Sequence, residues 1–224
     1  MCGRFTLHTP LDEVLAYFSL PTVDFEFNPS YNIAPTQQVL AVTSTSLGPS
    51  VSLMRWGLIP PWQLGVPRNA PPLINARLES LTEKRTFSPL VENSRCLILA
   101  DGFYEWKMIN GRKQPFYLTL HDKKPFAFAG LCLRETQPSC TIITKDSRGS
   151  LQDLHHRMPV ILNPKQAHCW LGSTPFVKLR ETFLNNHDDG LVYHPVSPLV
   201  NSPKHNEPEC IQPIRAKGLF EGLF

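Results

Sequence analysis

A chain of 224 residues is long enough to bury one large hydrophobic core or two small ones. Hydrophobic residues make up 42% of the chain and charged residues 18%, a balance typical of globular proteins. The formal net charge of +3 excludes a basic tail that wraps duplex DNA, so any nucleic-acid site has to be a local patch.

The first predicted helix follows a short opening strand and lies in the stretch TPLDEVLAYFSL. We expect Thr9 to cap this helix and Pro10 to occupy its first turn, where the missing N–H costs nothing. The apolar residues of the stretch recur three and four positions apart, which places them on one helical face. They are Leu11, Val14, Leu15 and Phe18.

The middle of the chain is predicted to be rich in strands. Residues 31–42 (YNIAPTQQVLAV) run from a proline-marked loop into a strand, and residues 51–62 (VSLMRWGLIPPW) form a strand that ends in paired prolines. Residues 74–85 (INARLESLTEKR) are predicted to begin a helix. Asn110 and Gly111 join two alternating runs, which indicates a tight hairpin turn. PFAFAGLCL and CTIITK continue as strands.

Two short helices are predicted in the last third. The stretch NPKQAHCWLG has Asn163 as its cap and Gly172 at its end, and TPFVKLRETFLNN repeats the design with Thr174 and Pro175. Residues 201–208 are polar and indicate a loop. The chain shows no repeat, linker or shift in composition. We therefore predict one α+β domain, built on an antiparallel sheet or barrel-like core with several short flanking helices.

The cysteines form no CxxC pair and mostly lie in apolar runs, so we expect buried free thiols in a reducing compartment. Their spacing does not suit zinc, and we predict no metal and no cofactor. The first twenty residues carry charges unlike a secretory signal, and no apolar run reaches membrane-spanning length. We expect a cytoplasmic protein without membrane contact. The cysteines are Cys2, Cys96, Cys132, Cys140, Cys169 and Cys210.

Cys2 directly follows the initiator methionine. Because a cysteine side chain is small, we expect removal of Met1, which makes Cys2 the N-terminal residue. A thiol and a free α-amine then belong to one residue, a combination that no internal cysteine offers.

Glu105 lies between two aromatic residues in the stretch DGFYEWK. Strand alternation places Phe103, Glu105 and Lys107 on one face of the strand and the two aromatic neighbours of Glu105 on the other. Desolvation in such surroundings raises the pKa of a carboxyl group and makes it a candidate proton shuttle near neutral pH. The alternative is a glutamate at the rim, paired with Lys107 or another cation.

The remaining polar candidates have ordinary explanations as well as functional ones. His155 and His156 are adjacent, so in an extended chain they point in opposite directions and at most one enters a given pocket. Asn75 can cap the predicted helix that follows it. Arg4, Arg77 and Arg157 can each be ordinary surface charges.

Taken together, these stretches resemble the SOS-response-associated peptidase (SRAP) family, whose members process abasic sites in single-stranded DNA. The resemblance runs through MCGRF, YNIAPTQ, RWGLIPPW, PPLINARLES, RCLILADGFYEWK, LHHRMPV and HPVS, and ends with NSPKHNEPECIQP. The chain departs from the family pattern at His156, where aspartate is common. It also departs in the loop between Trp62 and Pro71, which is longer than in compact members.

The resemblance implies a role for each candidate. Cys2 would be the nucleophile, with Asn75, Glu105 and His155 completing the catalytic site. The residues implied to bind DNA are Arg4, Arg77 and Arg157 for phosphates, and Pro35 and Trp62 for the surface on which bases stack. Residues 1–213 would form the catalytic domain and residues 214–224 a C-terminal tail.

The implied activity is capture of an abasic site in single-stranded DNA during the DNA damage response. The α-amine of Cys2 forms a Schiff base with the sugar aldehyde, and the thiol closes a thiazolidine ring. Strand cleavage by β-elimination and self-processing at Met1 are associated activities. Two alternatives stay open: a peptidase or amidase that uses Cys2 on an acyl substrate, and a non-catalytic reader of modified or single-stranded DNA.

The C-terminal tail suggests a partner. Two apolar pairs four residues apart would share one face of a helical turn, either packed on the domain or docked on a sliding clamp near DNA. The residues are Leu219, Phe220, Leu223 and Phe224.

Overall fold

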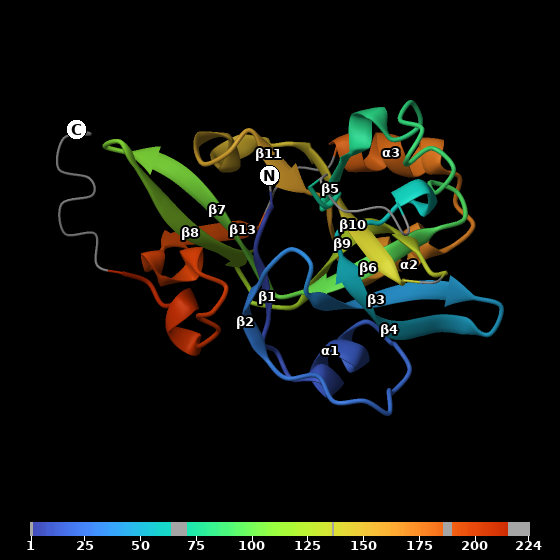
Figure 1. The fold of residues 1–224 in the computed structure, drawn as a ribbon, viewed down its shortest axis with the longest axis horizontal. Coiled ribbons are helices and arrows are strands. Elements are labelled where there is room, and N and C mark those ends of the chain that lie inside the picture. The colour runs from blue at the N-terminus through green and yellow to red at the C-terminus, as the bar shows by residue number, and fades with distance from the viewer. Residues whose placement is uncertain (1, 64–70, 136, 186–189, 215–224) are drawn as a thin grey trace.

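Strands dominate the fold, and the helices are short (Figure 1). The structure is a computed structural model that describes residues 2–63, 71–135, 137–185 and 190–214. The strands are β1 (Phe5–Leu7), β2 (Ser30–Ile33), β3 (Gln38–Thr45), β4 (Gly48–Trp56), β5 (Asn75–Arg77), β6 (Arg95–Ala100), β7 (Gly102–Ile109), β8 (Arg112–Leu120), β9 (Phe126–Leu133), β10 (Ser139–Asp146), β11 (Arg157–Pro159), β12 (Ile161–Leu162) and β13 (Leu191–Pro195). The α-helices are α1 (Leu11–Tyr17), α2 (Pro164–Leu171) and α3 (Phe176–Asn185). Short 3-10 helices lie at Pro61–Gln63, Leu78–Ser80, Gly149–Asp153, Pro198–Asn201 and Pro208–Ile211.

The strands form two sheets. The smaller sheet is antiparallel, in the order β13-β8-β7-β1-β2. The larger sheet has the order β11-β10-β4-β3-β6-β9-β12, with β5 paired to β10. Because β10 also pairs with β9, the pairings from β10 through β4, β3, β6 and β9 return to β10. These observations confirm the predicted α+β class. The larger sheet is mixed and not purely antiparallel as predicted, because β10 runs parallel to β4 and β5.

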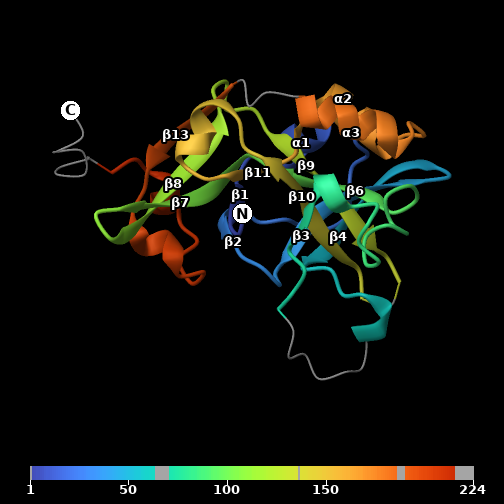
Figure 2. The same cartoon turned by 90° about the horizontal axis from the view of Figure 1, so that it is seen from above.

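The smaller sheet lies beside the larger one (Figure 2), and aromatic side chains join the two. The ring of Phe5 on β1 lies 5.0 Å from that of Trp56 and 5.5 Å from that of Phe128, in edge-to-face contacts. Phe103 on β7 packs against the same Phe128 ring at 6.1 Å. Each such buried ring stabilises the fold by about 1.5–3 kcal/mol. The packing fixes β1, which follows Cys2, and β7, which carries Glu105, against the larger sheet.

The hairpin between β7 and β8 forms as predicted. Asn110 and Gly111 have φ angles of 50° and 76°, so both central residues of the turn take the left-handed conformation that such turns require. The register follows directly, with Ile109 opposite Arg112 and Glu105 opposite Phe116. The alternation expected along β7 also holds, because Phe103 faces the main core while Tyr104 lies in a second apolar cluster on the other face.

Helices α2 and α3 pack beside the larger sheet, and α2 has its predicted cap. The side-chain oxygen of Asn163 accepts a 3.0 Å hydrogen bond from the backbone of Gln166, whose side chain accepts one in return. This capping box is worth about 1 kcal/mol or more to a helix of this length. Among the described residues, none of the helices is both long and apolar enough to cross a membrane.

Two local predictions are wrong. Residues 74–85 contain no α-helix: Asn75–Arg77 form β5 and Leu78–Ser80 a 3-10 helix. Pairing with β10, where Ile142 lies opposite Asn75, overrides the local helix preference. Helix α1 is not capped by Thr9 either. The Thr9 hydroxyl instead donates to the carboxylate of Asp101 at 2.9 Å.

Candidate active site

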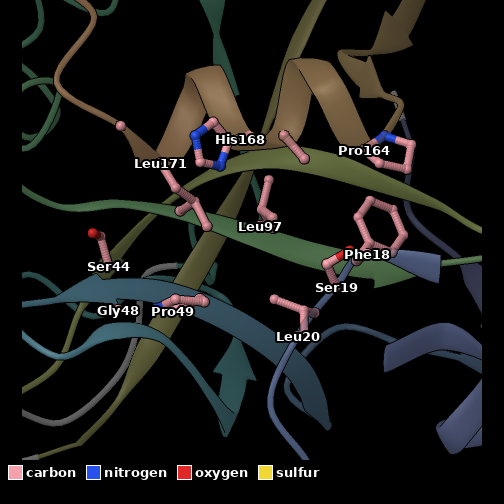
Figure 3. Close-up of a pocket in the computed structure, with 12 residues that line it drawn as sticks. Phe18, Ser19, Leu20, Ser44, Gly48, Pro49, Leu97, Pro164, His168 and Leu171 are labelled. Atoms are coloured by element: carbon pink, nitrogen blue, oxygen red, sulfur yellow. The ribbon is translucent and has the colours of Figure 1, made fainter. Parts of the chain in front are cut away.

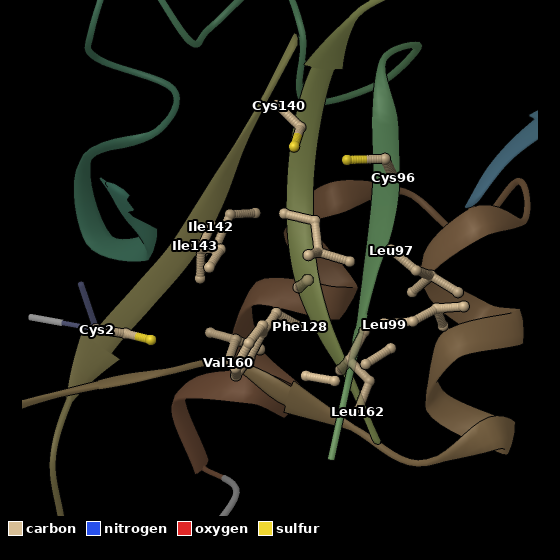
Figure 4. Packing of buried hydrophobic residues seen from close by; sticks show 14 of the residues in the cluster. Cys2, Cys96, Leu97, Leu99, Phe128, Cys140, Ile142, Ile143, Val160 and Leu162 are labelled. Carbon is tan, nitrogen blue, oxygen red and sulfur yellow. The ribbon is translucent and has the colours of Figure 1, made fainter. Parts of the chain in front are cut away.

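Cys2 lies just before β1 and is completely buried. Figure 4 shows its sulfur directed toward the apolar cluster that contains Phe128 and Val160. Burial raises the pKa of the Cys2 thiol above its ordinary range, and the nearby charge of Glu105 raises it further. A thiol in this environment is protonated at neutral pH, so its use as a nucleophile requires a base nearby.

The chain segment around Cys2 is held from both sides. On one side, the backbone N–H of Tyr104 on β7 donates to the carbonyl of Arg4 at 2.9 Å. On the other side, the Nδ2 atom of Asn75 on β5 donates to the carbonyl of Cys2 at 2.9 Å. The segment from Cys2 to Arg4 therefore lies between the two sheets, with one hydrogen bond to each.

Asn75 has a different role from the helix cap considered above, because it lies in β5 and no α-helix follows it. Its Nδ2 atom holds Cys2, while its Oδ1 atom is buried and accepts no hydrogen bond from the described residues. A buried amide oxygen without a donor carries a desolvation cost of about 1–3 kcal/mol. That oxygen is therefore available to a donor such as an amine or a sugar hydroxyl.

Glu105 is buried on β7, with 4% of its surface exposed. This burial raises the pKa of Glu105 to about 7. Lys107, two residues further on, is exposed, so the alternative position of Glu105 at the rim is wrong. A carboxyl group that titrates near neutral pH can both accept and donate a proton, as an acid–base catalyst must.

His155 is half-buried between a 3-10 helix and β11. Its Nδ1 atom lies 2.9 Å from the backbone nitrogen and 3.0 Å from the backbone carbonyl oxygen of Arg157, so Nδ1 accepts from the one or donates to the other according to the tautomer of the neutral ring. Burial lowers the pKa of His155 from its ordinary value, which favours this neutral ring at pH 7. The ring stacks on His156 at 4.5 Å, so the two histidines do not point in opposite directions as predicted, because the chain bends at His156.

The three candidate arginines differ in their burial and in the hydrogen bonds and ion pairs that they form within the protein. Arg77 is exposed at the end of β5. Arg4 is half-buried and donates to the side chain of Asn32 and to the Val200 carbonyl, each at 2.7 Å. Arg157 is buried and forms ion pairs with carboxylates on two other elements. Their predicted contacts with DNA phosphates stay predictions.

The two candidate stacking residues lie in loops. Trp62 is 56% exposed in the 3-10 helix that follows the paired prolines. Pro35 is half-buried in the turn between β2 and β3. Most of the loop after Trp62 lies outside the described residues. So do Leu219, Phe220, Leu223 and Phe224, the predicted clamp contacts.

Several polar residues that hold the candidate site were not predicted from the sequence. Asp101 accepts hydrogen bonds from the backbone of His8 and Thr9 and from the Thr6 hydroxyl, at 2.6 to 2.7 Å. Glu79 pairs with Arg157. Glu79 and Asp101 lie inside the motifs PPLINARLES and RCLILADGFYEWK, but nothing in their spacing indicates long-range partners.

An apolar pocket of about 280 Å³ lies away from these residues, between the end of α1, the β3–β4 hairpin and α2 (Figure 3). Phe18, Leu97 and His168 line it, and none of the predicted site residues does. The described residues hold no cluster of three His, Cys, Asp or Glu side chains able to bind a metal ion. The cysteines are free thiols, and all except Cys169 are buried.

Comparisons with solved structures support the fold. A protein from Bacteroides thetaiotaomicron superposes with a TM-score of 0.78 at 22% identity, covering 96% of this chain and all of that one. A phage-related protein from Bordetella bronchiseptica superposes with a TM-score of 0.72 at 26% identity, covering 87% of this chain and 94% of that one.

Sequence comparisons extend over nearly the whole chain. Abasic site processing protein YoqW of Bacillus subtilis is 38% identical, covering 95% of this chain and 99% of that protein. Abasic site processing protein YedK of Escherichia coli is 30% identical, covering 96% and 100%. Abasic site processing protein HMCES of Rattus norvegicus is 31% identical, covering 95% and 76%. The family model described as SOS response associated peptidase (SRAP) matches residues 1–203, and the chain belongs to this family.

Proposed function

We propose that this protein captures abasic sites in single-stranded DNA through Cys2, once Met1 has been removed. The observation that carries the proposal is the buried Glu105 carboxyl group, whose pKa is about 7 and whose charge acts on the Cys2 thiol. A site with a nucleophile and a neutral-pH acid–base group suits carbonyl chemistry. The printed names of the relatives supply the substrate, an abasic site.

The first step joins the α-amine of Cys2 to the open-chain aldehyde of the abasic sugar. An α-amine has an ordinary pKa of about 7.7–8.0, so part of it is unprotonated at neutral pH. The nitrogen attacks the aldehyde carbon, and loss of one water gives an imine. Glu105 in its protonated form donates the proton that the departing hydroxyl requires.

The second step closes the ring. The thiol proton of Cys2 passes to the Glu105 carboxylate, sulfur bonds to the imine carbon, and the imine nitrogen takes up a proton. The product is a five-membered thiazolidine that links protein and DNA. Because both nucleophiles belong to one residue, closure is intramolecular and has a large effective concentration. Diversion of the imine into the ring competes with β-elimination, which would break the strand.

Two further residues orient the reactants. Asn75 fixes the Cys2 backbone through Nδ2, and its buried Oδ1 is placed to accept from the α-amine or a sugar hydroxyl. His155 would offer a ring N–H to a sugar oxygen or to the adjacent phosphate. In this scheme neither residue forms a covalent bond to the substrate.

The DNA strand would be held by a few contacts, since the net charge is only +3. Arg77 and Arg4 would hold phosphates, and Trp62 with Pro35 would support exposed bases. Exposed aromatic rings next to isolated positive charges are typical of single-strand binding.

The test uses protein whose intact mass shows loss of Met1, incubated with a single strand that carries one abasic site. We expect a heat-stable crosslink on a denaturing gel, and none with an intact strand. Cys2→Ala should abolish it but leave an imine that borohydride traps, because the α-amine remains. Cys2→Ser should behave like Cys2→Ala, since a hydroxyl closes a far weaker ring.

The same experiment separates the other activities. A stable crosslink in Cys2→Ala contradicts the thiazolidine. Binding to abasic strands without any covalent product, trapped or stable, indicates the non-catalytic reader. Retention of Met1 in Cys2→Ala but not in Cys2→Ser would indicate self-processing that needs a nucleophile at position 2.

A further inference from the structure

The guanidinium group of Arg157 is occupied by the protein. Its side chain is 5% exposed. Two of its nitrogens donate side by side to the two carboxylate oxygens of Glu79, both at 2.9 Å. One of them also donates to Asp146 at 2.6 Å and the other to the Thr144 carbonyl at 2.7 Å. This two-point geometry is the strongest that arginine makes with a carboxylate.

The partners of Arg157 belong to different elements of the site. Glu79 lies in the 3-10 helix directly after β5, four residues beyond Asn75. Asp146 ends β10, and its backbone N–H donates to Glu79 at 3.2 Å. Arg157 itself begins β11, two residues after His155. The ion pairs therefore tie the segment that carries Asn75 to the segment that carries His155.

The backbone of Arg157 continues this connection to the histidine ring. Its backbone nitrogen and carbonyl oxygen lie 2.9 Å and 3.0 Å from Nδ1 of His155, so the backbone of Arg157 holds the ring in place. A phosphate contact by Arg157 would require its guanidinium to leave Glu79, a carboxylate only 32% exposed. That carboxylate would then be left without its cation, next to an incoming anion.

We propose that Arg157 is a positioning residue and not a phosphate ligand: with Glu79 it holds Asn75 and His155 in place. This role rests on the proposed function for its kinetic consequence, but its structural part can be measured on the free protein.

The first measurement is the pKa of the His155 ring in the absence of DNA, by NMR of protein with labelled histidine, with the signal assigned by His155→Gln. Burial holds this pKa below its ordinary value. Glu79→Gln and Arg157→Lys should each raise it toward about 6.5, the value of an unconstrained histidine. Glu83→Gln removes one charge from an exposed position nearby and should leave it unchanged. An unchanged His155 pKa in folded Glu79→Gln and Arg157→Lys would overturn the proposal, whatever the crosslinking assay shows.

The second measurement is the crosslinking rate at saturating abasic DNA. Displacement of a group that orients the reactants lowers the rate by about tenfold to a hundredfold. Glu79→Gln and Arg157→Lys should therefore both crosslink slowly. Asp146→Asn should be milder, because Asp146 is 77% exposed and the ion pair is screened by water. A phosphate ligand predicts the reverse order: Glu79→Gln would bind DNA better, and Arg157→Lys would retain function.

The third measurement is the salt dependence of binding to an intact single strand, which needs no chemistry. Arg77→Ala should reduce the slope by about 0.7, the value for one phosphate contact, while Arg157→Gln should leave it unchanged. A reduction by Arg157→Gln equal to that of Arg77→Ala overturns the proposal. Far-ultraviolet circular dichroism identifies variants that fail to fold. If one does, the crosslinking rates of Glu79→Gln, Asp146→Asn and their double variant test the proposal. Residues of one network should lower the rate less in the double variant than the product of the two single effects.

Discussion

The side-chain amide of Asn75 donates a 2.9 Å hydrogen bond to the backbone carbonyl of Cys2, across 73 positions of sequence. The bond determines where the start of the chain lies relative to β5. Asn75→Asp keeps the size of the side chain but replaces the donor by a second acceptor. A net hydrogen bond contributes about 0.5–1.5 kcal/mol, so the crosslinking rate should fall about twofold to tenfold.

The measurement is single-turnover crosslinking of an abasic strand. Asn206→Asp is the control, because Asn206 also bonds to a strand, through Tyr31 and Ser30, but has no contact with Cys2. Wild-type kinetics in Asn75→Asp would separate the hydrogen bond from catalysis.

Glu105 makes stability depend on pH. Burial raises its pKa from 4.5 to about 7, so the folded protein favours the neutral form. The stability that this preference contributes is complete below pH 4.5 and is lost as the pH rises through 7. The shift corresponds to about 3 kcal/mol. Glu105→Gln, which is always neutral, should therefore unfold at higher urea than wild type at pH 8 and at the same urea at pH 4.

The same substitution should change the chemistry in the opposite direction. Without the Glu105 carboxyl group, crosslinking and its reversal should both slow by about 10²–10⁴-fold, and the pH dependence of crosslinking between 6 and 8 should keep only the titration of the Cys2 α-amine. Equal rates for Glu105→Gln and wild type over this range would exclude a proton shuttle. A gain in stability together with a loss of rate would assign the buried carboxyl to function and not to folding.

Local patterns predicted the parts of the fold that local energies determine. The β7–β8 turn follows from Asn110 and Gly111, and the α2 cap follows from Asn163, because in both places neighbouring residues satisfy each other. The face of Glu105 follows from strand alternation alone. These features need no knowledge of the rest of the chain.

The sequence did not predict the local structure where a residue distant in the chain determines it. Residues 75–77 have the composition of a helix start but pair with β10, almost seventy residues away. Thr9 has the chemistry of a cap, yet Asp101 takes its hydroxyl. The burial of Arg157 also depends on Glu79, whose position is set by that pairing with β10. The resemblance to the family supplied the candidate site residues, but it did not indicate which of the arginines form ion pairs within the protein.

Asp101 holds the end of β1, the strand that follows Cys2. Its carboxylate accepts hydrogen bonds from the backbone N–H groups of His8 and Thr9 and from two threonine hydroxyls, all within 2.9 Å. Asp101→Asn turns one acceptor into a donor that faces other donors. Hydrogen bonds to a charged group contribute about 1.5–3 kcal/mol, so urea unfolding should show a loss of about 3 kcal/mol. Asp24→Asn, at an exposed position, should show no loss.

Trp62 should contribute to binding by stacking and not by charge. Its side chain is 56% exposed at a position where an aromatic ring has no need to serve the core. Stacking of one base on such a ring is worth about 1–3 kcal/mol and does not depend on sequence. Trp62→Ala should therefore weaken binding to an intact single strand by about fivefold to a hundredfold. The affinity of Trp62→Phe should lie between those of wild type and Trp62→Ala.

The salt dependence of that binding distinguishes a stacking residue from a phosphate ligand. A neutral ring releases no counterions when it stacks on a base. Trp62→Ala should therefore lower the affinity by the same factor at every salt concentration, and the slope of log affinity against log salt should equal that of wild type. Leu47 is a matched control: it is 99% exposed in the β3–β4 turn, and Leu47→Ala should not change affinity. An affinity of Trp62→Ala equal to that of Leu47→Ala would show that Trp62 does not contact the bound strand. A flatter slope in Trp62→Ala would show instead that the substitution displaces a neighbouring positive charge, because the ring itself carries none.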